Sequence, residues 1–254
     1  MSLTVVKLGS TLVADDAGDV RTDVLREVCR QVGAIHTDGH SATLVTSGAI
    51  ALGMRKLGKP VRPTAIEELQ AASAVGQGPL YDVYAELLGG HGAEAAQVLL
   101  TFLDISARDQ YVNARRTLEK LLEWQVVPVI NENDTTATDE ITFGDNDILA
   151  AQVAILMSAD LLVVLSDVDG LFTADPARDA DASLVREVND LAELRDYEIG
   201  MSSSHVGSGG MRSKVLCAEM ATSAGIPVVI CNGTQAGTLS HAVAADPVGT
   251  RAHV

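Results

Sequence analysis

Short hydrophobic runs alternate along the chain with longer segments in which apolar residues recur at helical spacing. Each run is short and rich in aliphatic residues, which predicts a buried strand. The predicted strands are residues 3–8, 42–45, 95–100, 126–130, 161–165 and 228–231. The predicted helices are residues 24–35, 66–88, 111–124, 147–157 and 214–224, and the weaker elements are residues 185–188 and 191–197. Regular alternation of strands and helices predicts an α/β fold, a three-layer α/β/α sandwich with a mainly parallel central sheet.

The longest helical segment, residues 66–88, contains two closely spaced glycines. They fall in Gly76-Gln77-Gly78, and we expect an interruption of the helix there because glycine weakens helix interiors. The run of small residues at 71–74 indicates tight packing, of the kind seen where one helix lies against another.

A polar segment follows the predicted strand 126–130. It is rich in carboxylates and amides, at Asn131, Glu132, Asn133, Asp134, Asp139, Glu140, Asp145, Asn146 and Asp147. Clustered carboxylates repel one another, so they need solvent, a metal or a cationic ligand. A solvated turn is the alternative, since Asn, Asp and Gly are the usual turn formers. We favour a binding loop, because it leaves the carboxyl end of a core strand, where open α/β sheets bind ligands.

A lysine stands inside the first predicted strand, just before its closing glycine. Lys7 is followed by Leu8, Gly9 and Ser10. Charged groups are rarely buried without a partner, so one explanation is an edge-strand lysine whose ammonium group reaches solvent. We favour a functional lysine, because Gly9 and Ser10 offer backbone and hydroxyl donors beside it.

Two glycine turns open predicted helices. Ser47-Gly48 follows the strand 42–45, where small hydroxyl residues at a helix start either bind an anion or cap the helix. Residues 207–213 form a glycine-rich turn before the helix that starts at Lys214. Its amides are suited to phosphate oxygens with Lys214 as the point charge, and a flexible linker is the alternative. Residues 53–60 resemble a P-loop but end in Pro60, so we interpret them as a turn.

Composition narrows the classes of partner. The 254 residues are 47% hydrophobic but only 3% aromatic, which predicts an aliphatic core. A formal charge of −16 argues against nucleic acid or an anionic membrane as partner, and it requires the few cations to be concentrated at any anion site. Three scattered cysteines without a C-x-x-C pair fit a reducing cytoplasm and no metal-ligand set. Residues 1–10 lack the features of a signal peptide, and no apolar run is long enough to span a membrane.

In a parallel sheet, the strand-end groups would converge at one edge. Lysines, glycine turns and carboxylates together are typical of phosphoryl transfer, which needs positioning and charge neutralisation more than covalent help. A dehydrogenase is disfavoured because no G-x-G-x-x-G follows the first strand.

Six motifs in this order give the chain a resemblance to a known family. They are K-L-G-S (7–10), V-T-S-G-A-I (45–50), P-V-I-N-E-N-D (128–134), F-G-D-N-D (143–147), L-S-D-V-D-G-L-F-T-A-D-P (165–176) and G-S-G-G-M-x-x-K (207–214). From residue 5 to residue 250 the chain resembles the amino acid kinase family. Within it, the N-E-N-D and G-D-N-D motifs together resemble members that phosphorylate L-glutamate.

The resemblance implies that ATP, with Mg²⁺, phosphorylates the γ-carboxylate of L-glutamate to L-glutamate 5-phosphate, the first step of proline biosynthesis. Lys7 and Lys214 would neutralise the transferring phosphate, with Asp147 between them as the residue that orients both. Glutamate would bind at Ser47, Gly48, Asn131, Asp134, Asp145 and Asn146. The nucleotide would bind at Lys7, Gly9, Ser166, Asp167, Ser208, Gly209, Gly210, Met211, Arg212, Ser213 and Lys214.

The same resemblance implies one kinase domain over residues 1–254. Residues 1–150 would bind the acyl substrate and residues 151–254 would bind ATP. We do not expect a C-terminal PUA domain, which many relatives carry. We expect a homo-oligomer and feedback by proline. Alternatives are kinases of the same fold acting on aspartate, N-acetylglutamate, carbamate or UMP, and a non-catalytic metabolite sensor. An N-acetylated substrate has no ammonium group and would match the acidic loop poorly.

Overall fold

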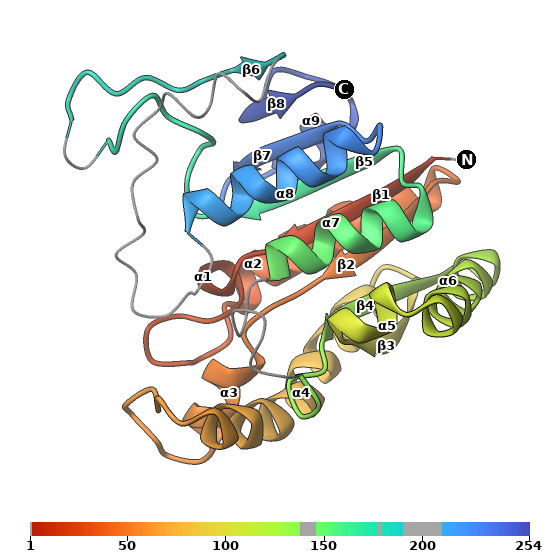
Figure 1. The fold of residues 1–254 in the computed structure, drawn as a ribbon, viewed down its shortest axis with the longest axis vertical. Coiled ribbons are helices and arrows are strands. Elements are labelled where there is room, and N and C mark those ends of the chain that lie inside the picture. The colour runs from red at the N-terminus through yellow and green to blue at the C-terminus, as the bar shows by residue number, and fades with distance from the viewer. Residues whose placement is uncertain (1, 138–145, 177–178, 190–209) are drawn as a thin grey trace.

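The computed structural model describes residues 2–137, 146–176, 179–189 and 210–254 (Figure 1). Eight strands in these ranges form one sheet in the order β3-β4-β2-β1-β5-β7-β8-β6. Their bounds are β1 Leu3–Leu8, β2 Ser41–Val45, β3 Glu94–Leu100, β4 Val126–Glu132, β5 Leu161–Ser166, β6 Glu187–Val188, β7 Val228–Asn232 and β8 Thr250–Ala252. The helices are α1 Ser10–Val13, α2 Thr22–Thr37, α3 Ala49–Lys56, α4 Ile66–Gly89, α5 Phe102–Ser106, α6 Arg108–Glu123, α7 Asn146–Met157, α8 Met211–Ser223 and α9 Thr238–Val243.

The sheet is parallel except at one pair of strands. β1 pairs in parallel with both β2 and β5, so their carboxyl ends lie side by side at the same edge. Among the described strands, only β7 and β8 pair antiparallel. The prediction of a mainly parallel sheet is confirmed, whereas β8 was not predicted, because three residues of the sequence Thr-Arg-Ala carry no hydrophobic run.

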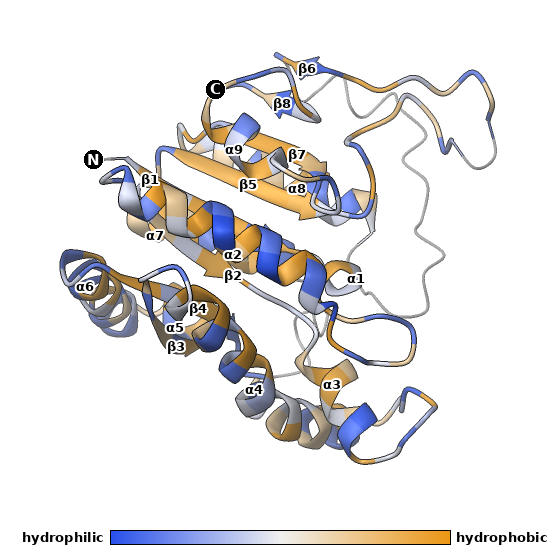
Figure 2. Ribbon diagram, turned by 180° about the vertical axis from the view of Figure 1, so that it is seen from behind, coloured by the Kyte–Doolittle hydropathy of each residue, from blue (hydrophilic) through white to orange (hydrophobic). Residues whose placement is uncertain are grey.

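Helices cover both faces of the sheet (Figures 1 and 2). Val6 and Leu8 of β1 point to the face covered by α2, α4 and α9, whereas Val5 points to the face covered by α6, α7 and α8. This alternation is the two-residue period of a strand. Because both faces of β1 are buried, the strand reads as a continuous hydrophobic run, and the predicted three-layer sandwich is confirmed.

The predicted interruption of the helix at residues 76–78 is wrong. α4 runs unbroken from Ile66 to Gly89. Gly76 is needed for packing instead: a Cβ atom there would lie 1.8 Å from the carbonyl oxygen of Ala49 in α3. Gly53 of α3 lies as close to α4, since its Cβ would lie 1.7 Å from the carbonyl oxygen of Ala72. The two glycines let α3 and α4 approach at backbone distance, as the small residues of this helix indicated.

The segment 185–188 contributes only the two residues of β6, and the segment 191–197 lies outside the described residues. All three cysteine side chains are buried. Within the described ranges, no helix combines the length and the apolar character needed to cross a bilayer.

Candidate active site

Lys7 lies on a central strand, so the edge-strand interpretation is wrong. β1 has β2 on one side and β5 on the other. Strand alternation turns the Lys7 side chain to the same face as Val5, which is the face covered by α7 and α8. Only 4% of Lys7 is exposed, and a lysine that deep requires an anionic partner.

Asp147 is that partner, and it serves two lysines. It lies in the first turn of α7 and is fully buried. Its Oδ1 is 2.5 Å from Nζ of Lys7, and its Oδ2 is 3.3 Å from Nζ of Lys214 in α8. Ser213 donates a hydrogen bond of 2.8 Å to the same Oδ2. The structure thus brings together the three predicted catalytic residues, two of them from the N-termini of neighbouring helices.

Burial and charge act in opposite directions on Asp147. Burial alone would raise the pKa of its carboxyl group, but the ammonium groups of Lys7 and Lys214 and the hydroxyl of Ser213 outweigh that effect and lower the pKa to about 2. The helix N-terminus also favours negative charge at this position. Asp147 is therefore ionised at neutral pH and fixes both lysines in place.

A chain of amides lies next to this group. Nδ2 of Asn146 donates to the carbonyl oxygen of Thr46 at 2.5 Å, to Oδ1 of Asn131 at 2.7 Å and to Oγ of Ser47 at 3.2 Å. Nδ2 of Asn131 donates in turn to Oε1 of Gln77 at 3.0 Å. Oδ1 of Asn146 is buried and accepts no hydrogen bond from the described part of the chain. A buried acceptor of this kind is suited to a donor on a ligand.

Asp134 presents a second buried carboxylate. It is 6% exposed, and Ser73 of α4 donates a short hydrogen bond to its Oδ2. Burial raises the pKa of Asp134, and the Ser73 hydroxyl and the Arg62 charge offset this only in part. A cation that arrived at this carboxylate would lower its pKa, so the site is suited to an ammonium group.

Some of these groups line one small cavity, of about 40 Å³. Its walls are formed by Ser10, Ser47, Gly48, Ala49, Ile50, Ala51, Arg62, Asn131, Asp134 and Asn146. Gly48 has φ = 98°, and a Cβ atom there would lie 2.8 Å from Cγ1 of Val13, so only glycine fits. Gly48 is also the N-cap of α3, without a side-chain hydrogen bond; the alternative that Ser47 caps the helix is therefore wrong.

The predicted nucleotide residues that the structure describes lie on β1, β5 and α8 or directly next to them. Gly9 follows β1 and donates its N–H to Leu165 of β5 at 3.1 Å. Ser166 ends β5, and its hydroxyl bonds to the following Asp167 at 3.2 Å. Gly210 precedes α8, whose first turn contains Met211, the exposed Arg212, Ser213 and Lys214. Asp145, Ser208 and Gly209 lie outside the described residues.

Ser73, Gln77 and Arg62 line or support the site but were not singled out from the sequence. Ser73 and Gln77 are four residues apart and so share one face of α4, and Gln77 also donates to the carbonyl oxygen of Glu132 at 3.2 Å. That spacing was available as a signal. Arg62 lies in a loop, and its sequence position gave no such signal. In the described ranges, no group of three or more His, Cys, Asp or Glu side chains is placed to hold a metal ion.

Comparison with known proteins decides the family. Residues 2–232 match the model of the Amino acid kinase family. The chain belongs to the amino acid kinase family. Among solved structures, isopentenyl phosphate kinase of T. acidophilum and UMP kinase of Bacillus anthracis superpose with TM-scores of 0.68 each, at 18% and 17% identity. They cover 99% of this chain, and this chain covers 100% and 96% of theirs. At that identity they establish the amino acid kinase fold alone.

Curated members of the amino acid kinase family are closer in sequence. Glutamate 5-kinase of Rhodopseudomonas palustris (strain BisA53) is 49% identical over 90% of this chain, and glutamate 5-kinase of Burkholderia cenocepacia (strain HI2424) is 46% identical over 97%. The chain spans 61% and 66% of the length of these two relatives.

Proposed function

We propose that this chain transfers the γ-phosphoryl group of ATP to the γ-carboxylate of L-glutamate, giving L-glutamate 5-phosphate and ADP. This is the reaction that opens proline biosynthesis. The observation that carries the proposal is the buried group of Lys7, Asp147 and Lys214. It lies next to a cavity that contains a second buried carboxylate, Asp134, which is suited to an ammonium group. The 46–49% identity to glutamate 5-kinases supports the choice of substrate.

The chemistry needs no general base. The γ-carboxylate of glutamate is ionised at neutral pH, so one of its oxygens attacks the γ-phosphorus directly. A bond from that oxygen to phosphorus forms as the bond from phosphorus to the β,γ-bridging oxygen breaks, and the electron pair leaves with ADP. Catalysis then depends on alignment and on neutralising the equatorial phosphate oxygens.

Lys7 and Lys214 supply that neutralisation. Asp147 holds one ammonium group at each of its oxygens, so the two charges are fixed before the substrates arrive. Preorganised charges in a buried site stabilise a transition state without reorganisation at the moment of reaction. Because two ammonium groups face one carboxylate, the group keeps one net positive charge for the phosphate.

The cavity provides for the amino acid. Its α-ammonium group would bind between Asp134 and the buried Oδ1 of Asn146, both of which lack a cationic partner in direct contact within the described residues. Ser47 and Gly48 would face the reacting end, and Asn131 would orient Asn146 through their hydrogen bond. Asp145 is proposed for this site on the resemblance alone.

We assign ATP to the side of the Lys7–Asp147–Lys214 group that faces away from the substrate cavity. Gly9, Ser166, Asp167 and residues 210–214 lie at the carboxyl ends of β1 and β5 and at the start of α8, where α/β sheets bind nucleotides. Ser208 and Gly209 are proposed for this site on the resemblance alone. This supports the division in which residues 1–150 bind the acyl substrate and residues 151–254 bind ATP. Mg²⁺ would enter with the nucleotide, because it keeps several water ligands and needs few protein carboxylates beside the phosphate oxygens. Both oxygens of Asp147 are already paired with lysines.

The decisive experiment is ADP release from Mg-ATP with a panel of acceptors, with hydroxylamine added to trap acyl phosphate as a hydroxamate. We expect ADP and hydroxamate to form with L-glutamate and not with N-acetylglutamate, aspartate or UMP. Turnover with another acceptor would reassign the acidic cavity, and no turnover in folded protein would favour a metabolite sensor.

Proline feedback is a separate proposal, supported by the similarity to glutamate 5-kinases and by a cavity suited to an amino acid. Glutamate-dependent ADP release should fall in millimolar proline, and unchanged rates would contradict the proposal. A homo-oligomer is likewise still a prediction, which light scattering on the purified chain would test.

A further inference from the structure

The substrate cavity contains two charged side chains of opposite sign. Among its described lining residues, Asp134 is the one carboxylate and Arg62 is the one cation; the other polar side chains are neutral. An α-amino acid carries an ammonium group and a carboxylate on the same carbon atom. A pair of opposite charges on one wall is the pattern that recognises such a zwitterion.

Arg62 lies in the loop between α3 and α4 and is half-buried. Burial lowers the pKa of its guanidinium group, and the nearby charge of Asp134 opposes that effect. A guanidinium group nevertheless remains charged at neutral pH. Partial burial therefore removes water from a permanent cation.

Arg62 and Asp134 interact electrostatically but do not form a salt bridge. Each affects the pKa of the other, yet no ion pair within 4.0 Å joins them. The described residues offer Arg62 no hydrogen-bond or ion-pair partner of any kind. Both side chains line the same cavity without pairing with each other, so each keeps its charge available to a ligand.

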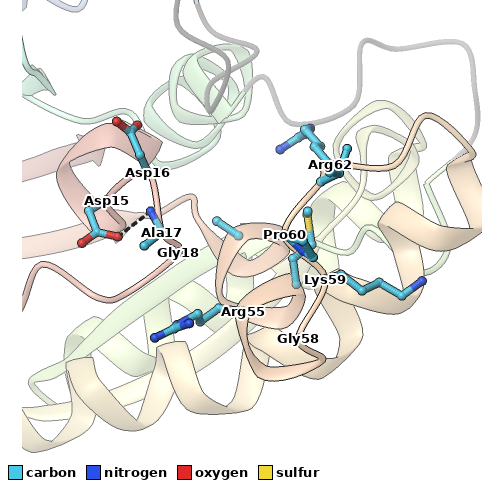
Figure 3. A pocket seen from close by; sticks show the side chains of 12 residues that line it. Asp15, Asp16, Ala17, Gly18, Arg55, Gly58, Lys59, Pro60 and Arg62 are labelled. Atoms are coloured by element: carbon cyan, nitrogen blue, oxygen red, sulfur yellow. Dashed lines mark hydrogen bonds between the residues drawn. The ribbon is translucent and has the colours of Figure 1, made fainter.

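The neighbouring cations show that this arrangement is specific to Arg62. It also lines an adjoining cavity of about 700 Å³, together with Asp15, Arg55 and Lys59 (Figure 3). Nε of Arg55 is 2.9 Å from Asp19, and Nζ of Lys59 is 3.2 Å from Glu68. Those two cations are engaged by surface carboxylates, whereas Arg62 stands where the larger, outer cavity meets the substrate cavity.

We infer that Arg62 binds the α-carboxylate of the amino-acid substrate and so determines specificity for it. The inference rests on the proposed function, because it names a further contact at the same site. The substrate would lie with its ammonium group at Asp134 and its α-carboxylate at Arg62. Its γ-carboxylate would point past Gly48 and Ser10 toward Lys7.

The test compares two acceptors in matched variants. L-Isoglutamine keeps the ammonium group and the γ-carboxylate of L-glutamate but replaces the α-carboxylate by a neutral amide. Arg62→Met should lower kcat/KM for L-glutamate by about 30-fold, mainly through KM, in line with the loss of one charge-assisted hydrogen-bonding group. It should change kcat/KM for isoglutamine by less than about 2-fold, since that substrate has no charge to lose.

Lys59→Met is the control, since it removes a cation from the same loop and the adjoining cavity without touching the substrate cavity. It should leave both substrates unaffected, and Arg62→Lys should restore part of the glutamate preference. Equal losses for both substrates in Arg62→Met, or no loss for glutamate, would overturn the inference. Absence of glutamate turnover in the wild type would instead reject the proposed function, and calorimetric binding of glutamate to the wild type and to Arg62→Met would then test Arg62 by itself.

Discussion

Asp147 divides its two oxygens between two lysines, and that division sets the properties of the site at the scale of single residues. Either lysine can be removed without leaving the carboxylate unpaired, because the other remains. The cost of such a change should therefore fall on catalysis more than on folding.

Lys214→Ala should reduce turnover by about 100-fold or more, because it removes one of the two charges that we propose to face the transferring phosphate. Calorimetric binding of L-glutamate should stay within about 2-fold of the wild type, since Lys214 does not line the substrate cavity. Lys120→Ala, which removes an exposed lysine of α6, is the control and should change neither quantity. Loss of glutamate binding in Lys214→Ala would contradict the assigned role.

The pKa of Asp134 should be visible in kinetics. Burial raises it, so the carboxylate becomes protonated as the pH falls, the ammonium site is lost and KM for glutamate rises. Ser73→Ala removes a hydrogen bond that lowers this pKa, so the midpoint of the KM–pH profile should move to higher pH. Ser106→Ala removes an exposed hydroxyl of α5 and should leave the midpoint in place. An unshifted midpoint in Ser73→Ala would argue that another group governs KM.

At this scale the sequence was informative where a motif surrounds the residue. Lys7, Asn146 and Asp147 were predicted together, and the structure brings them together. Arg62 was not predicted, because its proximity to Asp134 depends on how the loop before α4 packs, and no local pattern contains that information. For Ser73 the four-residue spacing from Gln77 marks a shared helix face, but only the packing of α4 shows that this face meets Asp134.

At the scale of elements, the crossing of α3 over α4 positions the substrate cavity. α3 begins at the cavity wall with Ala49, and α4 supplies Ser73 beneath it. The crossing is made close by Gly53 and Gly76, whose hydrogens meet the backbone of the opposite helix. Substitution at this contact should therefore affect both folding and substrate binding.

Gly76→Ala and Gly78→Ala form a matched pair within α4. A Cβ at Gly76 meets backbone at 1.8 Å, whereas a Cβ at Gly78 meets no atom within 4 Å. Gly76→Ala should cost about 1–3 kcal/mol of unfolding free energy through overpacking and should raise KM for glutamate. Gly78→Ala should stabilise the helix by about 0.5–1 kcal/mol, since alanine replaces an unconstrained helical glycine. Urea denaturation followed by circular dichroism would measure both; equal effects would reject the close-contact explanation.

The same helix shows why elements were harder to predict than the fold class. Glycine weakens helices locally, and from the sequence that effect predicted a break near residue 76. In the fold the close approach of α3 requires the glycine, so tertiary packing overrides the local preference. The short strand β8 escapes prediction, and β6 was predicted only as part of a weak element at residues 185–188, for a related reason: neighbouring strands, rather than their own residues, define them.

At the scale of the whole molecule, the catalytic group joins distant parts of the chain. Lys7 comes from β1, Asp147 from α7 and Lys214 from α8, and one continuous sheet holds all three elements. Alternation of strands and helices in the sequence predicted that strand-end groups converge, because a parallel sheet gathers its strand ends at one edge. The place of Asp147 between the two lysines came from the resemblance to the family.

Asp147→Asn should destabilise the protein by about 3–5 kcal/mol at pH 7, because two buried lysines lose their counter-charge. In the wild type, the folded-state pKa of Asp147 is about 2, below the ordinary value of 3.8, so its stabilising effect is present above about pH 4 and is lost as the pH falls toward 2. The gap between the two proteins should therefore narrow over that interval in urea titrations. Asp19→Asn, at an exposed salt bridge, should cost under about 1 kcal/mol, and a gap that is independent of pH would contradict the assignment.

Because Lys7, Asp147 and Lys214 are buried, salt should act differently on the binding of the proposed substrates and on the chemical step. The chain carries a formal charge of −16, so the proposed substrates, anionic ATP and glutamate, would approach against a repulsive field that mobile ions weaken. Lys7 and Asp147 are only 4% and 0% exposed, so those ions screen their charges much less. Ionic strength should thus change kcat/KM for the proposed substrates, while kcat, which depends on the buried charges, stays nearly constant.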